Sequence, residues 1–185
     1  MKWFTVFLVS LAATAASAQS DFHVVSGSEV LLEGGRVDKL TVVSGNYQFN
    51  IRPPRGWYRE VNESGREIIF TSPSSKSAMT VQFTTNFPGV LPEQDTLRTR
   101  VLGEHPGASI LQSTVCPTGY RPGVLFDLVR VPAPQVVQKI RHAFVAEPLG
   151  SVECSLAASD DEFEGNKTLF MGLMRAFRVD KVDRQ

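Results

Sequence analysis

The most regular hydrophobic pattern in the chain lies in residues 47–57, which read YQFNIRPPRGW. Every second residue from Tyr47 to Ile51 is apolar, and this alternation is typical of a β-strand with one buried face. The two prolines that follow end the strand, because proline has no N–H to donate to a sheet. Gly56 permits a turn, and Trp57 is expected to fold back over the sheet. The segment predicts a strand followed by a rigid corner at the start of the folded domain.

Further segments carry strand patterns bounded by glycine, proline or small polar residues. Most are joined by short turns, which favours a mainly antiparallel sheet. In the longest one we expect Val137, Ile140 and Phe144 to point inward. The predicted strands are 57–61, 67–71, 79–84, 109–115, 124–131, 135–145 and 151–156.

Two segments change to the helical period. Residues 91–104 contain apolar positions at helical spacing and are followed by Pro106, which predicts a helix of about three turns. A second helix is predicted from Ser159, which forms a capping-box pattern with Glu162. The apolar residues of this second helix fall on one face. They are Phe163, Phe170, Leu173, Met174 and Phe177.

The order of elements is strands, helix, strands, helix, and it predicts an α+β fold. We expect a central, mostly antiparallel sheet flanked by two main helices. Residues 47–179 are predicted to form this single domain. Residues 19–46 precede it as a lead-in segment, partly mobile or forming an edge strand, and residues 180–185 form a polar tail.

The first eighteen residues have the pattern of a secretory signal peptide. Lys2 is followed by a short apolar run, and small residues at 16–18 form a cleavage site before Gln19. The run is too short for a stable membrane span, although an uncleaved N-terminal anchor is the alternative. No cysteine stands at the cleavage site, which argues against a lipoprotein. We therefore expect an exported protein, periplasmic or secreted, with no integral membrane span after cleavage.

The charge of the chain is balanced, with 19 basic and 19 acidic residues. Loss of Lys2 on cleavage leaves 18 basic against 19 acidic, a net charge of −1. A near-neutral domain has no electrostatic footprint for nucleic acid and no polybasic membrane patch. We therefore expect no nucleic-acid partner.

The chain has two cysteines, Cys116 and Cys154. An even number of cysteines in an exported chain favours a disulfide, which would contribute roughly 3–4 kcal/mol by constraining the unfolded chain. The alternative is a pair of free thiols with metal or redox chemistry. The absence of a Cys-x-x-Cys motif, and of a histidine at ligand spacing, favours the disulfide.

The three histidines, His23, His105 and His142, are far apart in the sequence. No two have the spacing of a metal-binding motif, so each is expected to be a solvated surface residue, with His142 on the outer face of a strand. The sequence contains no Gly-x-Ser-x-Gly elbow and no glycine-rich phosphate loop. We therefore predict no catalytic residue, no cofactor and no metal, and an enzyme is the less favoured class.

A small basic and aromatic patch surrounds the proline corner. It consists of Arg52, Arg55, Trp57, Tyr58 and Arg59. Arginine and aromatic residues are enriched at the centres of interfaces, so the patch is a candidate site for an anionic or protein partner. The alternative interpretation is that Trp57 belongs to the core and the arginines keep a sheet edge soluble.

Two further motifs have simple explanations. The glycosylation sequons at Asn62 and Asn166 matter only in a eukaryotic host. The acidic residues of 160–164 could bind a cation, but their position at a predicted helix N-terminus favours a role in stabilising the helix.

Three short motifs resemble the PsbP-like superfamily. They are Phe49-Asn50-Ile51, the corner 53–57 and the end of the last helix, 174–178. That superfamily includes the extrinsic subunit of photosystem II, the nuclear-import factor that binds Ran, and bacterial envelope proteins of the DcrB and LpqN type. The resemblance spans residues 47–179 and implies a central antiparallel sheet sandwiched by helices. The signal peptide fits an envelope member, and no binding residue of the other branches can be carried over.

Together these features favour a non-catalytic exported protein, of the cell envelope or the extracellular space, that binds a partner protein or supports an assembly. We expect neither a nucleic-acid partner nor an integral membrane span. One alternative is a small hydrolase with an unrecognised site, which would need a histidine beside a carboxylate and a nucleophile. The other is a carrier of a small ligand or lipid, which would need an apolar cavity.

Overall fold

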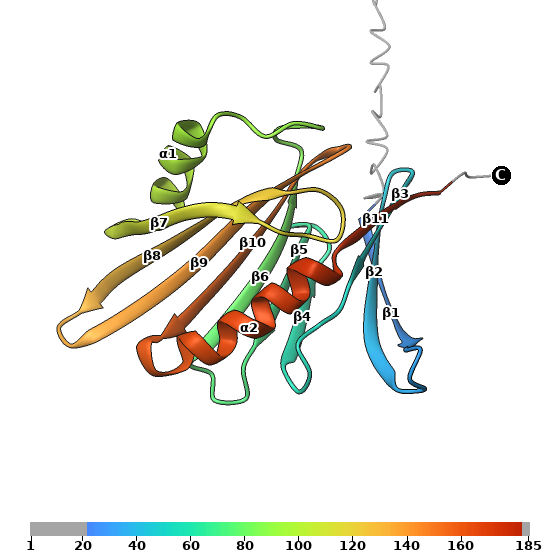
Figure 1. Ribbon diagram of the computed structural model, residues 1–185, viewed down its shortest axis with the longest axis horizontal. Helices are drawn as coiled ribbons and strands as arrows, with labels where there is room; N and C mark the ends of the chain where they lie inside the picture. The colour runs from blue at the N-terminus through green and yellow to red at the C-terminus, as the bar shows by residue number, and fades with distance from the viewer. Residues whose placement is uncertain (1–21, 183–185) are drawn as a thin grey trace, which may run out of the picture.

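The computed structural model describes residues 22–182, which form two antiparallel sheets and two helices (Figure 1). Residues 1–18, predicted as the signal peptide, lie outside the described residues. The elements in chain order are β1 (Phe22–Val30), β2 (Arg36–Ser44), β3 (Tyr47–Ile51), β4 (Tyr58–Asn62), β5 (Glu67–Thr71), β6 (Ser77–Thr84), α1 (Gln94–Glu104), β7 (Ala108–Cys116), β8 (Gly123–Ala133), β9 (Val136–Glu147), β10 (Gly150–Ser159), α2 (Asp160–Ala176) and β11 (Arg178–Lys181).

The strands are divided between a small and a large sheet. The small sheet has four strands in the order β1-β2-β3-β11, and the large one has seven in the order β4-β5-β6-β10-β9-β8-β7. Their strand pairs are antiparallel. The α+β class and the antiparallel pairing are thus confirmed, but there are two sheets instead of one.

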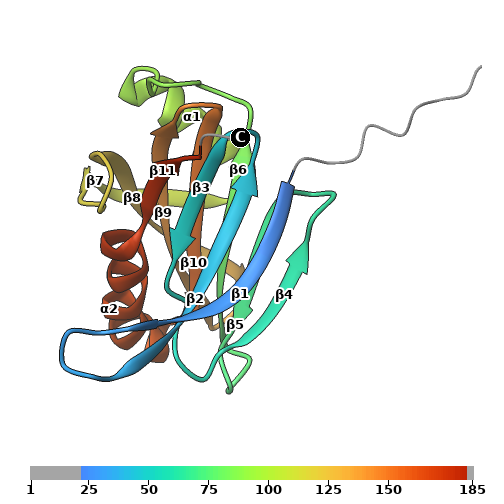
Figure 2. The same ribbon diagram turned by 90° about the vertical axis from the view of Figure 1, so that its right-hand side faces the viewer.

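The proline corner accounts for the division into two sheets. It connects β3, in the small sheet, to β4, at the edge of the large sheet (Figure 2). Gly56 has a φ of +78°, a conformation that residues with a side chain rarely adopt. The predicted strand, proline stop and glycine turn are therefore all confirmed, and their effect is to pass the chain from one sheet to the other.

The larger hydrophobic cluster joins the small sheet and α2 to one face of the large sheet (Figure 1). Phe49 of β3 is central to it, with ring centroids 5.0 Å from Phe83 of β6 and 6.1 Å from Phe177, directly after α2. The predicted apolar face of the last helix is confirmed, because Phe163, Phe170, Leu173, Met174 and Phe177 are all buried.

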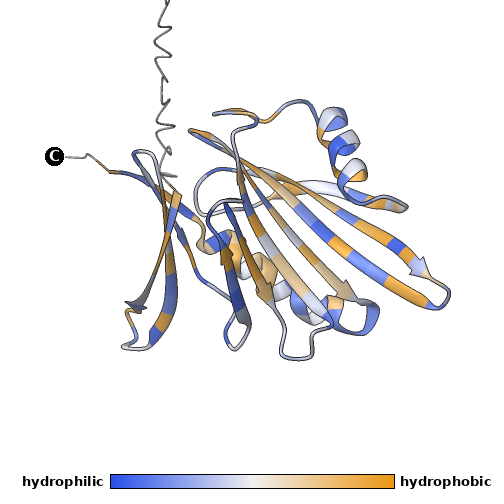
Figure 3. Ribbon diagram, turned by 180° about the vertical axis from the view of Figure 1, so that it is seen from behind, coloured by the Kyte–Doolittle hydropathy of each residue, from blue (hydrophilic) through white to orange (hydrophobic). Residues whose placement is uncertain are grey.

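A smaller cluster lies under α1, on the opposite face of the large sheet. Leu97 and Val101 of α1 pack on residues of β8 and β9 that include Phe126, Ile140 and Phe144. Alternate residues of the central strands therefore belong to the two clusters, and Figure 3 shows bands of apolar and polar residues along these strands.

The part of the lead-in segment that the structure describes, from Phe22 on, is folded. Residues 22–44 form the hairpin β1–β2, and β1 is an edge strand of the small sheet within the described residues. Leu40 and Val42 are buried in the same cluster as Phe49, so the core begins before Tyr47. At the other end, β11 pairs with β3, so the strand runs through Asp180 to Lys181 and the polar tail is shorter than predicted.

Two local predictions are wrong. Val137 is exposed, not inward: it lies beside the β8–β9 turn at Pro134-Gln135, and the alternation of β9 puts it on the opposite face from Ile140 and Phe144. Ser159 precedes α2, but its side chain makes no capping hydrogen bond. Glu162 instead accepts a hydrogen bond of 2.7 Å from Ser77 Oγ, which fastens the start of α2 to β6. Among the described residues, no helix is long and apolar enough to cross a membrane.

Candidate functional site

The predicted basic and aromatic patch is divided by the fold. Trp57 is half-buried and packs on the larger hydrophobic cluster, whereas Tyr58 is 68% exposed. Arg55 and Arg59 are exposed, and within residues 22–182 neither forms an ion pair. Arg52 points elsewhere, because its guanidinium binds Glu29 at 3.0 Å. Trp57 therefore packs against the core, as the alternative interpretation expects, while Tyr58 and two arginines remain on the surface.

A groove of about 490 Å³ lies between the proline corner and the β1–β2 hairpin. Trp57, Tyr58 and Arg59 line one side, and residues of β1 and β2 line the other, including Gly27 and Asp38. Both β1 and β4 are edge strands in their sheets. The groove therefore lies between two sheet edges, and Arg52 belongs to a separate groove beside α2.

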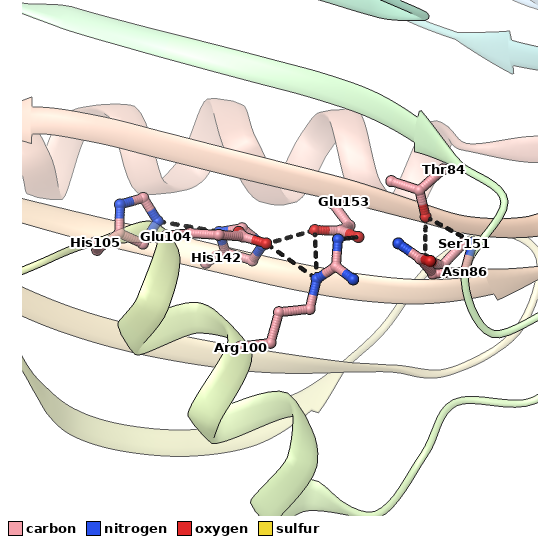
Figure 4. Close-up of polar contacts among 8 residues, drawn as sticks. All are labelled: Thr84, Asn86, Arg100, Glu104, His105, His142, Ser151 and Glu153. Carbon is pink, nitrogen blue, oxygen red and sulfur yellow. Dashed lines mark hydrogen bonds and ion pairs between the residues drawn. The ribbon is translucent and has the colours of Figure 1, made fainter.

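A second polar site, which sequence reasoning did not find, lies where the end of α1 meets the large sheet (Figure 4). Three of its members come from α1 and its C-cap: Arg100, Glu104 and His105. The other two, His142 of β9 and Glu153 of β10, lie on the face of the sheet that α1 covers. We call these five residues the histidine–carboxylate cluster.

Local sequence explains how α1 ends at this cluster. His105 is the C-cap of the helix, and its N–H bonds to the carbonyl of Val101. Pro106 and then Gly107, with a φ of +77°, turn the chain back into β7. The last turn of the helix is thereby held over β9, with Glu104 and His105 facing His142.

The two histidines are in direct contact. His105 Nε2 lies 3.2 Å from His142 Nδ1. The other ring nitrogen of His142, Nε2, lies 3.7 Å from Glu104 Oε2 and 3.9 Å from Glu153 Oε2. His142 Nε2 is buried and has no hydrogen-bond partner at these distances. An orphaned polar atom of this kind is rare in a protein interior.

Arg100 joins the two carboxylates of the cluster. Its Nε lies 3.0 Å from Glu104 Oε1, and its Nη2 lies 2.6 Å from Glu153 Oε1. Glu153 is only 3% exposed, whereas the Glu104 side chain is 35% exposed. One guanidinium therefore faces two carboxylates, of which one is buried and one is open to solvent.

The environment shifts the proton affinities in the cluster. Burial, followed by the nearby charges of His105 and Arg100, lowers the pKa of His142 to about 3. Burial also lowers the pKa of His105. Burial, followed by the charge of Glu104, raises the pKa of Glu153. Both imidazoles are therefore neutral at neutral pH and have lone pairs available to a metal ion.

Three residues of the cluster could hold a metal. Glu104, His105 and His142 each offer one ligand atom, and these atoms lie within 4.8 Å of one another. The prediction of a solvated histidine is wrong for His142, which is buried, and His105 is half-buried; His23 is exposed, as predicted. One sequence signal could have found His142: it lies between Ile140 and Phe144, two residues predicted to point inward.

The nucleophile that a hydrolase needs is missing from the cluster. Ser151 and Thr84 lie nearby (Figure 4), but their hydroxyl oxygens are 2.9 Å apart and bond to each other. Among the described residues, no serine or threonine hydroxyl is hydrogen-bonded to His105 or His142. The arrangement therefore contains the histidine and carboxylate of a hydrolase without its activated nucleophile.

The two cysteines are not bonded to each other in the structure. Cys116 and Cys154 are buried free thiols at the end of β7 and in β10. Strands β8 and β9 lie between β7 and β10, and neighbouring strands are about 4.8 Å apart. The two thiols therefore come from strands that are not neighbours, although both belong to the larger hydrophobic cluster, and the predicted disulfide is absent from the structure.

The sequons and the acidic run have ordinary structural surroundings. Asn62 is exposed, and its Oδ1 accepts hydrogen bonds in the β4–β5 turn, whereas Asn166 in α2 donates one to Ser77 Oγ. The acidic residues at the start of α2 are engaged by protein groups. Lys139 binds Asp160, Lys76 binds Asp161, Ser77 binds Glu162 and Lys167 binds Glu164.

The fold matches solved structures of PsbP-like proteins. Cyanobacterial PsbP (CyanoP) from Synechocystis sp. superimposes with a TM-score of 0.53 and 12% identity, over 92% of this chain and 99% of that one. The Ran-binding protein Mog1p from Saccharomyces cerevisiae superimposes with a TM-score of 0.50 and 12% identity, over 84% of this chain and 96% of that one. No family model matches the sequence, and no curated protein matches it. The chain therefore has the PsbP-like fold predicted from its motifs.

Proposed function

We propose that this chain is an exported, non-catalytic domain that binds a partner protein at the groove beside its proline corner. The observation that carries the proposal is the combination of Tyr58, Arg55 and Arg59, all exposed and next to a groove between two sheet edges. Exposed tyrosine and arginine side chains beside a partly buried tryptophan are the residue types that dominate interface energies.

The geometry of the groove favours a protein partner over a small apolar ligand. Edge strands present unpaired backbone groups, to which an extended segment of another protein can add. The free arginines add positive charge, so acidic side chains in the partner would be favoured. The neighbouring groove is bordered by charged residues such as Glu29, Arg52 and Arg175, which does not suit a lipid.

CyanoP and Mog1p share the fold of this chain, and Mog1p is by its title a Ran-binding protein. At 12% identity this likeness carries no partner to the present chain. The export part of the proposal rests on the signal-peptide pattern of residues 1–18.

A comparative crosslinking experiment tests the proposal. The wild type, the double variant Tyr58→Ala/Arg59→Ala and the control Arg98→Ala would be expressed in the natural host and crosslinked in the envelope fraction. Arg98 is an exposed arginine of α1, remote from the corner. We expect a partner band that the wild type and the control retain and the double variant loses.

Two outcomes would contradict this proposal. A band that persists in the double variant would remove the corner from the interface. A chain that stays in the cytoplasm with residues 1–18 attached would remove export; the expected mature N-terminus is Gln19.

A further inference from the structure

We propose that Glu104, His105 and His142 form a binding site for a zinc-type divalent transition-metal ion, in which Glu153 positions the His142 ring. This site lies at the end of α1, apart from the proline corner, and does not depend on the proposed partner-binding function.

The distances between the side chains suit a tetrahedral metal. Zinc binds histidine nitrogen and carboxylate oxygen at about 2.0–2.2 Å, so two ligands of a tetrahedral site lie roughly 3.3 Å apart. His105 Nε2 and His142 Nδ1 are already 3.2 Å apart. The third ligand, Glu104, ends α1 and is partly exposed, so its carboxylate can move the remaining distance.

The second nitrogen of His142 supplies an independent indication. Its Nε2 is buried and unpartnered, and it points between two carboxylates at 3.7 and 3.9 Å. When Nδ1 binds a metal, Nε2 carries the proton and needs an acceptor, which is the usual outer arrangement of a metal-bound histidine. Glu153, buried and held by Arg100, is the carboxylate placed to accept it.

Charge also favours a cation here. Glu104 and Glu153 place two carboxyl groups beside the histidines, with the single guanidinium of Arg100 between them. Imidazole ligands select zinc, copper or nickel over calcium and magnesium, which prefer oxygen alone.

The exposed side of the cluster can supply the remaining ligand from solvent. Three protein ligands leave the fourth position of a tetrahedral ion open, and the side of the cluster formed by Glu104 and His105 reaches solvent. The ion can therefore enter from the end of α1, and a water molecule would complete its coordination.

Zinc titration of the mature, untagged protein by calorimetry tests the inference. We expect one zinc ion per chain at neutral pH and no comparable binding of Mg²⁺ or Ca²⁺. Glu104→Gln and His105→Gln should each weaken zinc binding at least tenfold. His23→Gln removes an exposed histidine that lies 3.8 Å from Glu63 and serves as the matched control, with unchanged affinity.

A positioning role for Glu153 has its own readout. Glu153→Gln should keep the stoichiometry of one and lower the affinity by roughly 10- to 100-fold. Co²⁺ bound to the wild type should show visible absorption bands of a tetrahedral site, and His105→Gln should abolish them. Circular dichroism confirms that each variant is folded. Absence of stoichiometric zinc binding, or unchanged affinity in folded His105→Gln, would overturn the inference.

Discussion

Asp127 and Arg141 form a two-pronged ion pair across β8 and β9, with Arg141 Nε 2.7 Å from Oδ1 and Nη2 2.7 Å from Oδ2. The two residues are directly opposite in the strand register, and both are buried. Burial opposes ionisation of Asp127, but hydrogen bonds from Arg141 and Gln112 outweigh it and lower the pKa of the carboxyl.

Replacing Asp127 with Asn should destabilise the fold by about 3–5 kcal/mol, because Arg141 would be left as an uncompensated buried charge. Urea unfolding followed by circular dichroism measures the loss. Asp161→Asn is the matched control, since its pair with Lys76 is largely exposed and should contribute far less. Equal losses in the two variants would contradict the assignment of Asp127–Arg141 as a buried pair.

His142 should make the fold sensitive to acid. Its pKa is about 3 in the folded protein and near 6.5 when exposed, so between these values only the unfolded chain binds the proton. The free energy of unfolding should therefore fall as the pH drops from 6.5 to 3, by at most about 1.4 kcal/mol per pH unit from this residue. His142→Gln should flatten that slope, measured by urea unfolding at several pH values, while His23→Gln should leave it unchanged.

Glu153 should act in the opposite direction. Its pKa is raised to about 7 by burial and then by Glu104, so the folded protein retains a proton that the unfolded chain loses near 4.5. This contribution to stability is present below 4.5 and is lost as the pH rises to about 7. Relative to the wild type, Glu153→Gln should therefore gain stability between these values. Glu164→Gln, at an exposed carboxyl of α2, is the control; parallel wild-type and Glu153→Gln curves would exclude the effect.

Two glycines should respond oppositely to alanine. A Cβ at Gly150 would lie 1.8 Å from the carbonyl oxygen of Thr84, so Gly150→Ala should force the β6–β10 pairing apart and lower the melting temperature. Gly172, in the exposed face of α2, has open space around its Cα. Gly172→Ala should stabilise by about 0.5–1 kcal/mol through helix propensity. Thermal unfolding of the two variants compares them directly, and a stabilising Gly150→Ala would refute the close approach.

The thiols offer a chemical test of the sheet order. Burial raises the pKa of Cys116 to about 11, and it also raises that of Cys154, so both thiols are protonated and shielded. We expect no reaction with a disulfide reagent in the native protein and reaction of two thiols per chain after unfolding. A mass lower by two hydrogens in unreduced material would instead reveal the disulfide that the sequence predicts.

Local patterns predicted most elements, because strands and helices follow from the spacing of apolar residues. In the strand Tyr47–Ile51 the two-residue alternation, and from Phe163 to Phe177 the helical spacing, predict which side chains are buried. The prediction failed for Val137, which is out of phase with Ile140 and Phe144 and lies at the exposed end of its hairpin.

The histidine–carboxylate cluster shows what only the tertiary structure decided. His105 and His142 are 37 residues apart, and their contact depends on where α1 crosses β9. The separation of Cys116 from Cys154 likewise depends on the strand order, which places β8 and β9 between them.

The sequence by itself determined the α+β class, the proline corner and the faces of the elements, because each depends on neighbours within a few residues. The tertiary structure decided the division into two sheets, the burial of His142 and the position of every polar group relative to distant ones. Those features depend on long-range packing, in which the partner of a side chain is set by how whole elements cross.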